Sequence, residues 1–515
     1  MTFPLMRDRH LDAETRPQTR KNWQTFLQPP ARPWYADWRL LLALIAFTAV
    51  TRAASFGSPV ISNDEEFYLL VGSRMLHGAL PYIDIWDRKP VGLFLIYAAT
   101  SALGPFQVIQ YQIAACLSAG CTAWVLYRIA RMIAPADGAL IAAACYPIML
   151  AGFSQIGGQA PVFYNLPVAI AAWWIARRYR DGDTRKLFAG GCGIMLLLGI
   201  AMQIKYTVMF EGICFGLALM WLAHVHGLHR GRIVPMAVAW VACALLPTAA
   251  AMAAYAAIGH LDEFVFANFV SIFSRESGMM KAVRRLAILT FFLSPLWVLL
   301  LWAPRRLGLR GNGSPQLAFI KAWAIAAFVG FLLIGTYYDH YVGPLLVPFL
   351  VLGARALGWQ GMRRRFAIGT LAFITICTAI HVPIRIHLAG NRDQFRTVAA
   401  AIERQLGPDG CLYIHEGEPG LYHATGACTV TRYLFTTHLN SLKEQHALGI
   451  DTAAEMRHIV AQRPQVIVKA VEPYSDPPNR PARAIMDRAL ARDYRETGRY
   501  QLGVHTLEIW RLRDR

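Results

Sequence analysis

The sequence predicts a mainly α-helical, polytopic membrane protein with a small α/β domain at its C-terminal end. The 515 residues are 55% hydrophobic and only 16% charged, with a mean hydropathy of +0.34, whereas soluble domains carry roughly a quarter charged residues. The apolar residues form long runs, which are typical of membrane spans. After residue 385 these runs give way to alternating helical and short strand patterns, which indicate the separate C-terminal domain.

Residues 1–38 are polar, rich in Arg and Pro, and too long for the charged start of a signal peptide. We interpret them as a cytoplasmic tail, followed by a transmembrane domain over residues 39–384. This domain is predicted to contain about eleven transmembrane helices, within a range of about 10–13, because the shorter runs can merge or tilt. The predicted spans are residues 39–57, 107–127, 137–152, 161–176, 187–204, 207–223, 233–258, 286–302, 316–335, 342–354 and 366–383.

Basic residues determine the predicted orientation. Five loops on one side carry "RIAR", "ARRYRDGDTRK", "HRGR", "PRRLGLR" and "ARALGWQGMRRR", and the opposite loops carry far fewer basic residues. By the positive-inside rule the N-terminus is cytoplasmic, and an odd number of spans leaves the C-terminus outside. The net charge of +19 therefore reflects membrane topology. No concentrated basic face is visible in the sequence, so nucleic acid is not a predicted partner.

Residues 58–106 form the predicted first external loop, with juxtamembrane helices. The stretch "SNDEEFYLLVGSRMLHGALPYIDIWDRKP", residues 62–90, holds five acids. The next segment, "KPVGLFLIYAATSALG", is apolar, but as a full span it would place the loops on inconsistent sides. We therefore predict a helix that lies in, or dips into, the membrane interface.

The acids in this loop have a structural and a chemical interpretation. Ser62 and Glu65 fit the capping box S-x-x-E, which opens a helix and by itself explains Glu65. In the chemical interpretation, Asp64 takes a proton from an incoming hydroxyl, with a pKa raised by the nearby bilayer. Arg88 and Lys89 then neutralise the charge on a departing phosphate. A lipid phosphate lies at this depth, which would explain why acids and bases gather at the membrane surface.

Two motifs carry a family resemblance. "DEEFY" fits D-E-x-x-Y, and "GALPYIDIWDRKP" fits G-x-x-P-Y-x-D…K-P, both in the first predicted external loop. Together with the spans and the external domain, they resemble the C-type glycosyltransferases that use polyprenyl-phosphate sugars. Within these, the chain resembles the bacterial branch of lipid A aminoarabinose transferase, the rhizobial galacturonosyltransferases and the protein mannosyltransferases.

The resemblance implies an inverting membrane glycosyltransferase in the bacterial inner (plasma) membrane. Such an enzyme moves a sugar from a polyprenyl-phosphate donor to a glycolipid, polysaccharide or protein acceptor at the periplasmic face. Residues 58–106 would be its catalytic external loop. Residues 385–515 would be a periplasmic α/β domain that covers the site or helps to choose the acceptor. The sequence names neither the sugar nor the acceptor.

The resemblance also implies roles for individual residues. Asp64 is the expected catalytic base, Tyr68 shapes the site, and Lys89 contacts the lipid phosphate. In "QIKYT", Lys205 is a second phosphate candidate, although a lone Lys between two spans is otherwise typical of an interfacial anchor. The further candidates are Glu65 for catalysis, Arg88 and Arg285 for the donor phosphate, and Tyr82, Asp84, Asp87, His340 and Tyr341 for lipid or substrate.

Two later segments belong to the same interpretation. "YYDHYVGPLLVPFL" resembles the aromatic element that contacts the lipid carrier before a late span, with Tyr341 as the best match. An interfacial aromatic belt is the alternative, and we prefer it for Tyr337 and Tyr338. The loop 259–285 is amphipathic and basic at its end, so it closes over the lipid or lies on the membrane.

The sequence departs from its relatives in the second external loop, where many of them place an acid. Here "SQIGGQAPVFYNLP" has no acid, and the polar residues available include Gln155, Gln159 and Asn165. No cluster has metal-ligand spacing and no Gly-rich phosphate loop is present. We predict no tightly bound metal or other cofactor, with a loosely bound divalent cation as the alternative. Two cysteines in the C-terminal domain, Cys411 and Cys428, either pair in an oxidising compartment or stay as buried thiols.

Three other functions fit parts of the sequence. A lipid-linked-sugar transporter or flippase would carry acids within its spans and internal repeats, whereas here only Glu211 lies in a span and we find no repeat. A membrane polysaccharide polymerase or ligase would have its site in a large late external loop. A catalytically inactive lipid-sugar-binding relative stays an alternative because the second-loop acid is missing.

Overall fold

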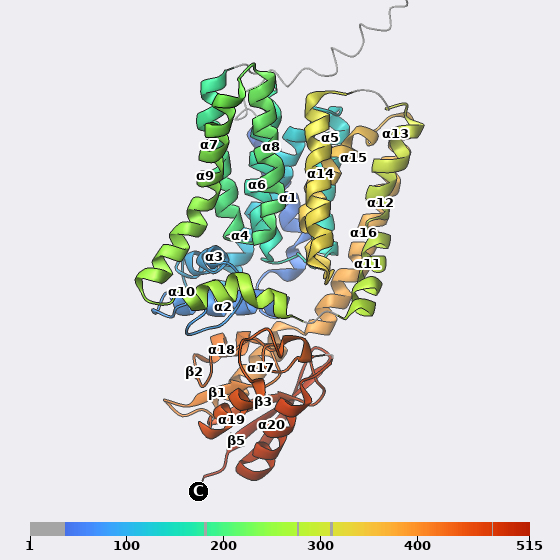
Figure 1. The fold of residues 1–515 in the computed structure, drawn as a ribbon. Coiled ribbons are helices and arrows are strands. Elements are labelled where there is room, and N and C mark those ends of the chain that lie inside the picture. Colours follow the sequence, from blue (N-terminus) through green and yellow to red (C-terminus); the bar gives the residue numbers. More distant parts are fainter. Residues whose placement is uncertain (1–36, 180–182, 276–277, 310–312, 476, 515) are drawn as a thin grey trace, which may run out of the picture.

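The computed structural model describes residues 37–179, 183–275, 278–309, 313–475 and 477–514; the predicted tail lies almost entirely outside these ranges. Long helices form a bundle, and a domain with a β-sheet lies against one end of it (Figure 1). The helices are α1 (Trp38–Thr51), α2 (Asn63–Met75), α3 (Val91–Ser101), α4 (Gln107–Ala130), α5 (Ala136–Gly152), α6 (Ala160–Arg178), α7 (Thr184–Met202), α8 (Met209–Val225), α9 (Arg230–Ala257), α10 (Leu261–Val265), α11 (Met279–Phe292), α12 (Ser294–Trp297), α13 (Ala303–Arg306), α14 (Pro315–Ile334), α15 (Gly343–Gly353), α16 (Gly361–Ala389), α17 (Arg392–Glu403), α18 (Gly420–Thr425), α19 (Thr452–Ala461) and α20 (Arg480–Asp493). The strands are β1 (Cys411–Ile414), β2 (Cys428–Thr429), β3 (Val466–Ala470), β4 (Tyr494–Leu502) and β5 (His505–Leu512).

The bundle confirms the predicted membrane protein. Among the described residues, six helices are long and apolar enough to cross a membrane: α4, α7, α8, α9, α14 and α16. A seventh span results if α11 and the helical segment Ser294–Arg306, bent by 60° relative to each other, count as one. Each predicted span coincides with a helical segment. Several of these segments, such as α1 and α5, are shorter than the 18 residues required of a candidate membrane span. The number eleven therefore stays a prediction.

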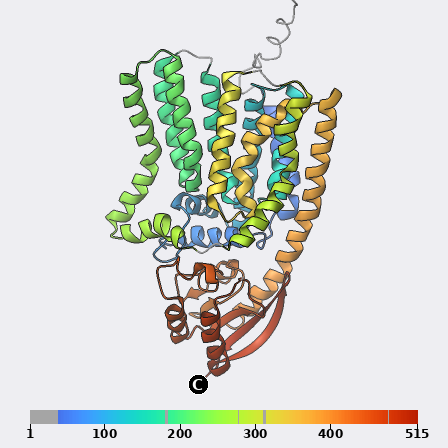
Figure 2. The same ribbon diagram turned by 45° about the vertical axis from the view of Figure 1, so that its right-hand side comes forward.

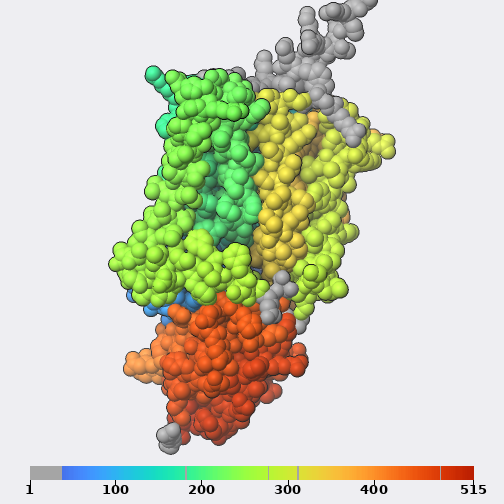
Figure 3. All heavy atoms as spheres, in the orientation of Figure 1, coloured from blue at the N-terminus to red at the C-terminus, as the bar shows by residue number. Residues whose placement is uncertain are grey.

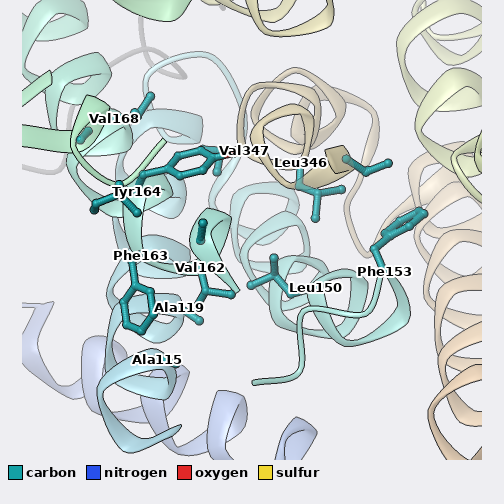
Figure 4. Packing of buried hydrophobic residues seen from close by; sticks show 14 of the residues in the cluster. Ala115, Ala119, Leu150, Phe153, Val162, Phe163, Tyr164, Val168, Leu346 and Val347 are labelled. Atoms are coloured by element: carbon teal, nitrogen blue, oxygen red, sulfur yellow. The ribbon is translucent and has the colours of Figure 1, made fainter. Parts of the chain in front are cut away.

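The centre of the bundle is packed by small, branched and aromatic side chains of α4, α5, α6 and α15 (Figure 4). Ala115 and Ala119 of α4 let neighbouring backbones approach closely, as is usual where helices associate within a membrane. Asn165 on α6 is buried, and its Nδ2 donates to Tyr146 Oη and to Gly343 O, both at 3.0 Å. Asn165 thus joins three helices and is not available for contacts with a sugar.

At the lower end of the bundle, α2 and α3 lie next to each other rather than among the long helices (Figures 1 and 2). This position agrees with the predicted interfacial helix. The predicted capping box is wrong, however. Ser62 is the N-cap of α2 by its backbone angles, but its hydroxyl caps no first-turn N–H, because it accepts a hydrogen bond from Gln159 Nε2 at 2.7 Å.

The segment 259–285 is helical over most of its length. After α10 it continues as a π-turn, Phe266–Val270, and a 3₁₀ turn, Ser271–Ser274. This part crosses the lower end of the bundle beside α2 (Figure 1). Its basic end belongs to α11, so Arg284 and Arg285 lie on a helix and not in a loop.

The sheet domain has the strand order β2-β1-β3-β5-β4. β1 is parallel to β2 and β3, whereas β5 is antiparallel to β3 and β4. α16 runs from the far end of the bundle into this domain (Figure 2) and ends at Ala389, slightly beyond the expected boundary at 385. Cys411 of β1 and Cys428 of β2 lie opposite each other in the parallel ladder and form a disulfide, which decides between the two alternatives for these cysteines.

Replacing Cys411 and Cys428 with Ser is expected to destabilise the sheet domain by about 3 kcal/mol, because the disulfide closes a loop of 17 residues. The measurement is limited proteolysis of the purified full chain over a temperature series. Cys377→Ser, in the middle of α16, serves as the control with a free thiol. Equal protease resistance in the double variant and the control would contradict the expectation.

Candidate active site

Three consecutive acids open α2, and their side chains face in three directions, because successive residues on a helix are about 100° apart. Asp64 is half-buried and faces a cluster of bases at the lower end of the bundle. Glu65 is fully buried and faces Arg52 at the end of α1. Glu66 faces the sheet domain, where its Oε2 accepts a hydrogen bond from Gly420 N at 2.9 Å. Only Asp64 therefore combines a carboxylate with access from outside.

Four side chains from separate parts of the chain surround Asp64 electrostatically: Lys89, His340, Gln159 and Lys205. Burial alone would raise the pKa of Asp64. The two lysines, the histidine and the amide outweigh this effect, so the pKa of Asp64 lies below its ordinary value, and the predicted rise is wrong. Asp64 is consequently ionised at neutral pH, which is the form a general base requires.

Backbone contacts bring the two lysines together. Tyr82 Oη donates to Lys89 O at 2.8 Å and so supports the backbone beside this lysine. Gly92 opens the first turn of α3 against Gln203 at the end of α7, and a Cβ on Gly92 would lie only 2.6 Å from Gln203 Cβ. Because only glycine permits this approach, the segment that carries Lys89 reaches the segment that carries Lys205.

The two lysines differ in charge state. Lys89 Nζ lies 5.4 Å from the centre of the Tyr68 ring; burial alone would lower the pKa of Lys89, but Tyr68 and nearby carboxylates raise it above its usual value. Lys205 Nζ lies 4.1 Å from the centre of the Tyr341 ring. Burial, helped by the charge of Lys89, lowers the pKa of Lys205 to about 7. An anion placed between these lysines would meet one full positive charge and one that titrates near neutral pH.

The aromatic element before α15 also borders the cluster, because Tyr341 adjoins Lys205 and His340 interacts with Asp64. His340 and Tyr341 lie in a 3₁₀ turn, Asp339–Val342, with ring centres 4.5 Å apart. Burial and then Lys205 lower the pKa of His340 to about 3, so its imidazole is neutral at neutral pH. Ser154 Oγ donates to Asp339 Oδ2 at 3.2 Å, which ties the turn to the loop after α5.

Several predicted site residues face elsewhere. Arg88 Nη2 forms an ion pair with Glu444 of the sheet domain at 2.7 Å, because alternate residues of the extended segment before α3 point to opposite sides. Asp84 is exposed and closes a local turn by accepting from Leu80 N at 2.7 Å. Arg285 donates to Thr336 O at 3.2 Å.

Three more predicted residues have clear structural surroundings. Asp87 is buried; burial raises its pKa, and the charge of Lys89 opposes this rise most strongly. The ring of Tyr82 packs against the rings of Tyr255 and Phe264. These contacts hold the segment between α2 and α3 against α9 and α10. Glu65 adjoins the backbone of Gly158 and the charge of Arg52. Burial raises the pKa of Glu65 to about 7. Of the predicted set, the structure brings together Asp64, Lys89, Lys205, Tyr68, Asp87, His340 and Tyr341.

The structure adds Arg275, which sequence reasoning missed. Its guanidinium is half-buried, forms an ion pair with Glu444 at 2.8 Å, and has Tyr341 and Asp64 among its electrostatic neighbours. Glu444 accepts from Arg88 and Arg275 together, so one buried carboxylate of the sheet domain joins the first external loop to the segment after α10. No feature of the sequence distinguishes Arg275 from the neighbouring arginines.

An apolar groove of about 590 Å³ runs between α8 and α14. Figure 3 shows the hollow between these helices, which are green and yellow there. Phe210 in the first turn of α8 and Val329 near the end of α14 line it. The chain segments that adjoin these helix ends carry Lys205 and Tyr341, so the groove leads towards the charged cluster. The other lining residues are Tyr179, Ile213, Cys214, Leu217, Ala218, Trp221, Pro315, Ala318, Phe319, Ala322, Ile325 and Ala326.

A second acidic pair joins α2 to the sheet domain. Glu66 and Glu418 are both buried, and Glu66 Oε1 and Glu418 Oε2 have no hydrogen-bond donor. Burial, followed by the mutual repulsion of the pair, raises the pKa of Glu66; burial raises that of Glu418 to about 8. Tyr474 adjoins Glu418, but its hydroxyl has no hydrogen-bond partner among the described residues, and Glu65 adds repulsion to Glu66. The pair is therefore stable in this arrangement when it holds a proton.

The contact between the sheet domain and α2 is expected to weaken as pH rises from about 5 to about 8. Both glutamates have folded-state pKa values above their unfolded values, so their contribution is fully present at low pH and is lost as pH rises through the folded pKa, about 8 for Glu418. For each proton that the folded state holds and the unfolded state has released, the free energy of unfolding falls by up to about 1.4 kcal/mol per unit rise in pH. Thermal unfolding of wild type and Glu418→Gln between these pH values tests this. A slope that is the same in both proteins would refute it.

Within the described ranges, no group of three or more His, Cys, Asp or Glu side chains is arranged to hold a metal ion. The predicted absence of a tightly bound metal stays a prediction. Asp64 is the one carboxylate of the cluster that is not fully enclosed, and it would be the first ligand of a loosely bound cation.

No family model and no curated protein sequence matches this chain. Solved structures do. ArnT from Cupriavidus metallidurans bound to undecaprenyl phosphate has a TM-score of 0.59 at 12% identity, over 92% of this chain and 98% of that one. The oligosaccharyltransferase AglB from Archaeoglobus fulgidus, in complex with an inhibitory peptide and a dolichol-phosphate, has a TM-score of 0.53 at 11% identity, over 85% of this chain and 70% of that one.

The chain has the C-type glycosyltransferase fold. This confirms the predicted resemblance in architecture, including the C-terminal domain, since ArnT matches over nearly its whole length. At these identities the comparison establishes the fold, and the fold hosts several substrates. What the site of this protein does follows from its own residues.

Proposed function

We propose that this protein is an inverting glycosyltransferase that moves one sugar from a polyprenyl-phosphate donor to a hydroxyl group of an acceptor. The observation that carries this proposal is the position of Asp64. It is an ionised, partly accessible carboxylate that faces Lys89 and Lys205, next to the segments at which an apolar groove ends. A molecule with a long apolar chain, a phosphate and a sugar has the three parts that these surroundings fit.

The donor would bind with its chain in the groove between α8 and α14 and its phosphate between the two lysines. The groove is open on the face shown in Figure 3, so a donor in the surrounding bilayer would be able to enter it. Tyr341 lies against Lys205 and would position the phosphate, and Arg275 would add charge from the opposite side. ArnT and AglB have been solved with undecaprenyl phosphate and with a dolichol-phosphate, which supports a donor of this class.

The reaction needs no resident cofactor. Asp64 takes the proton of the acceptor hydroxyl, and the acceptor oxygen attacks the anomeric carbon from the face opposite the phosphate. The bond between that carbon and the phosphate oxygen breaks, and its electron pair leaves on the polyprenyl phosphate. Lys89 and Lys205 stabilise the charge that develops on the leaving group. A single displacement of this kind inverts the anomeric configuration.

We place the reaction on the periplasmic side of a bacterial inner membrane, with the N-terminus in the cytoplasm. Two observations support this orientation. The sheet domain contains the Cys411–Cys428 disulfide, which is typical of oxidising compartments. The loops rich in Arg fall at the other end of the bundle, where α7 and α13 lie in Figure 1. The acceptor would approach from the side of the sheet domain and would be a glycolipid, a polysaccharide or a protein.

The test uses the purified full chain in lipid nanodiscs and a panel of polyprenyl-phosphate donors, each with a different radiolabelled sugar. Envelope extracts supply acceptors, and parallel reactions contain EDTA. We expect one donor to release polyprenyl phosphate and to label an extractable acceptor. Donor that crosses the bilayer of proteoliposomes without bond cleavage would instead identify a flippase. Binding without cleavage or movement would identify an inactive lipid-sugar-binding protein.

A further inference from the structure

Gln159 makes two contacts at the start of α2. Its Nε2 donates to Ser62 Oγ at 2.7 Å and reaches Asp64 Oδ2 at 3.4 Å. The side chain is 3% exposed, so it cannot exchange these partners for bulk water. The Ser62 hydroxyl accepts this bond and caps no backbone N–H of α2, although a serine cap typically contributes about 1 kcal/mol. The pairing with Gln159 therefore takes precedence over local helix chemistry.

The loop that carries Gln159 is held on several sides. Arg52 donates to the backbone oxygens of Gln155, Ile156 and Gly157 at 2.7–2.9 Å. Gly157 has no room for a side chain, because a Cβ there would lie 2.0 Å from Glu65 Oε2. These contacts fix the backbone shortly before residue 159. The amide consequently reaches Asp64 from a rigid frame and not from a mobile loop.

The chemistry of the partners sets the orientation of the amide. An ionised Asp64 only accepts hydrogen bonds, so the amide nitrogen and not the amide oxygen must face it. Ser62 can donate or accept, and it accepts here. The nitrogen thus supplies a neutral donor to a carboxylate that has Lys89 and Lys205 as its cationic neighbours. A neutral donor orients one oxygen without adding to the positive charge around the leaving group.

We propose that Gln159 is a positioning residue that holds Asp64 Oδ2 and thereby turns Oδ1 towards the acceptor hydroxyl. This inference rests on the proposed function, in which Asp64 is the base. The amide also favours the ionised form of the carboxylate, since a hydrogen bond to the charged form stabilises that form. The other titratable or charged groups that face Asp64 or adjoin it are Lys89, Lys205, His340, Arg275, Tyr68, Tyr97, Glu65 and Asp87, and a substitution at Gln159 replaces none of them.

The test compares Gln159→Leu and Gln159→Glu with wild type, by the pH profile of kcat/KM for the donor and by separate kcat and KM values. Leucine removes the donor at similar size. Glutamate retains the size, can accept a bond from Ser62, and places a second negative charge beside Asp64. We expect kcat to fall about tenfold in Gln159→Leu with little change in KM. The acidic limb of the profile should move up by about one pH unit in this variant and further in Gln159→Glu.

Gln155→Leu is the matched control, because Gln155 lies in the same loop and is buried, and neither atom of its amide has a hydrogen-bond partner. It should keep the wild-type pH profile. A loss of activity in both Gln159 variants without a shift of the acidic limb would indicate a purely structural role and would overturn the proposal. Unchanged activity in both would also overturn it. If wild type turns over no donor, the proposed function itself fails, which separates the two outcomes.

Discussion

Replacing Asp64 with Asn is expected to reduce the turnover of donor by about 10²–10⁴-fold, the range that general-base catalysis supplies. The amide nearly preserves the size of the carboxylate but cannot take a proton from the acceptor hydroxyl. Binding of the donor should change much less, because the groove and the two lysines stay in place. The measurement is the release of free polyprenyl phosphate per enzyme, with donor binding followed separately.

Asp84→Asn is the matched control, since Asp84 lies in the same external loop, is exposed and bonds only within its own turn. It should turn over donor at the wild-type rate. Glu65→Gln separates the two acids of the motif. Glu65 meets Arg52 and backbone, so this variant should lose thermal stability more than rate. Equal turnover in wild type and Asp64→Asn would remove Asp64 as the base.

The part of this site that could be predicted from the sequence is the part written in short motifs. Asp64, Tyr68 and Lys89 lie within one stretch, and the D-E-x-x-Y and K-P patterns identify them without knowledge of the fold. Lys205 was equally a candidate anchor until the structure placed Gly92 against Gln203. That contact requires a residue without a Cβ at position 92 and the end of α7 beside it, although the two are more than a hundred residues apart in the sequence. No local sequence pattern predicts such a contact.

The direction in which each side chain points is the main feature of the site that could not be predicted from the sequence. Arg88 and Lys89 are adjacent and look like one basic pair, yet Arg88 pairs with Glu444 in the sheet domain whereas Lys89 faces Asp64. In the same way, the capping-box pattern is present at Ser62, but the Ser62 hydroxyl accepts a bond from Gln159 and caps no N–H of the helix. Each of the eleven apolar runs coincides with a helical segment, because hydropathy depends on composition alone. Contacts between distant segments depend on packing, which the runs do not encode.

The second large effect is expected at Lys89. Replacing it with Met should lower kcat/KM for the donor by about a hundredfold or more, because the variant loses one of the two cations that face the departing phosphate. Lys186→Met is the matched control, since Lys186 is 69% exposed and pairs with Asp183 at the far end of the bundle. The control should turn over donor like wild type.

The pH dependence of Lys89→Met gives a sharper test than the rate alone. In wild type, burial and the charge of Lys89 lower the pKa of Lys205 to about 7, so Lys205 loses its proton as pH rises through neutrality. Without Lys89, the pKa of Lys205 should rise towards its ordinary value, and Lys205 should stay charged to a higher pH. The alkaline limb of kcat/KM should therefore move up in Lys89→Met while the maximum falls. A lower maximum with an unmoved alkaline limb would mean that the two lysines do not act on the same phosphate.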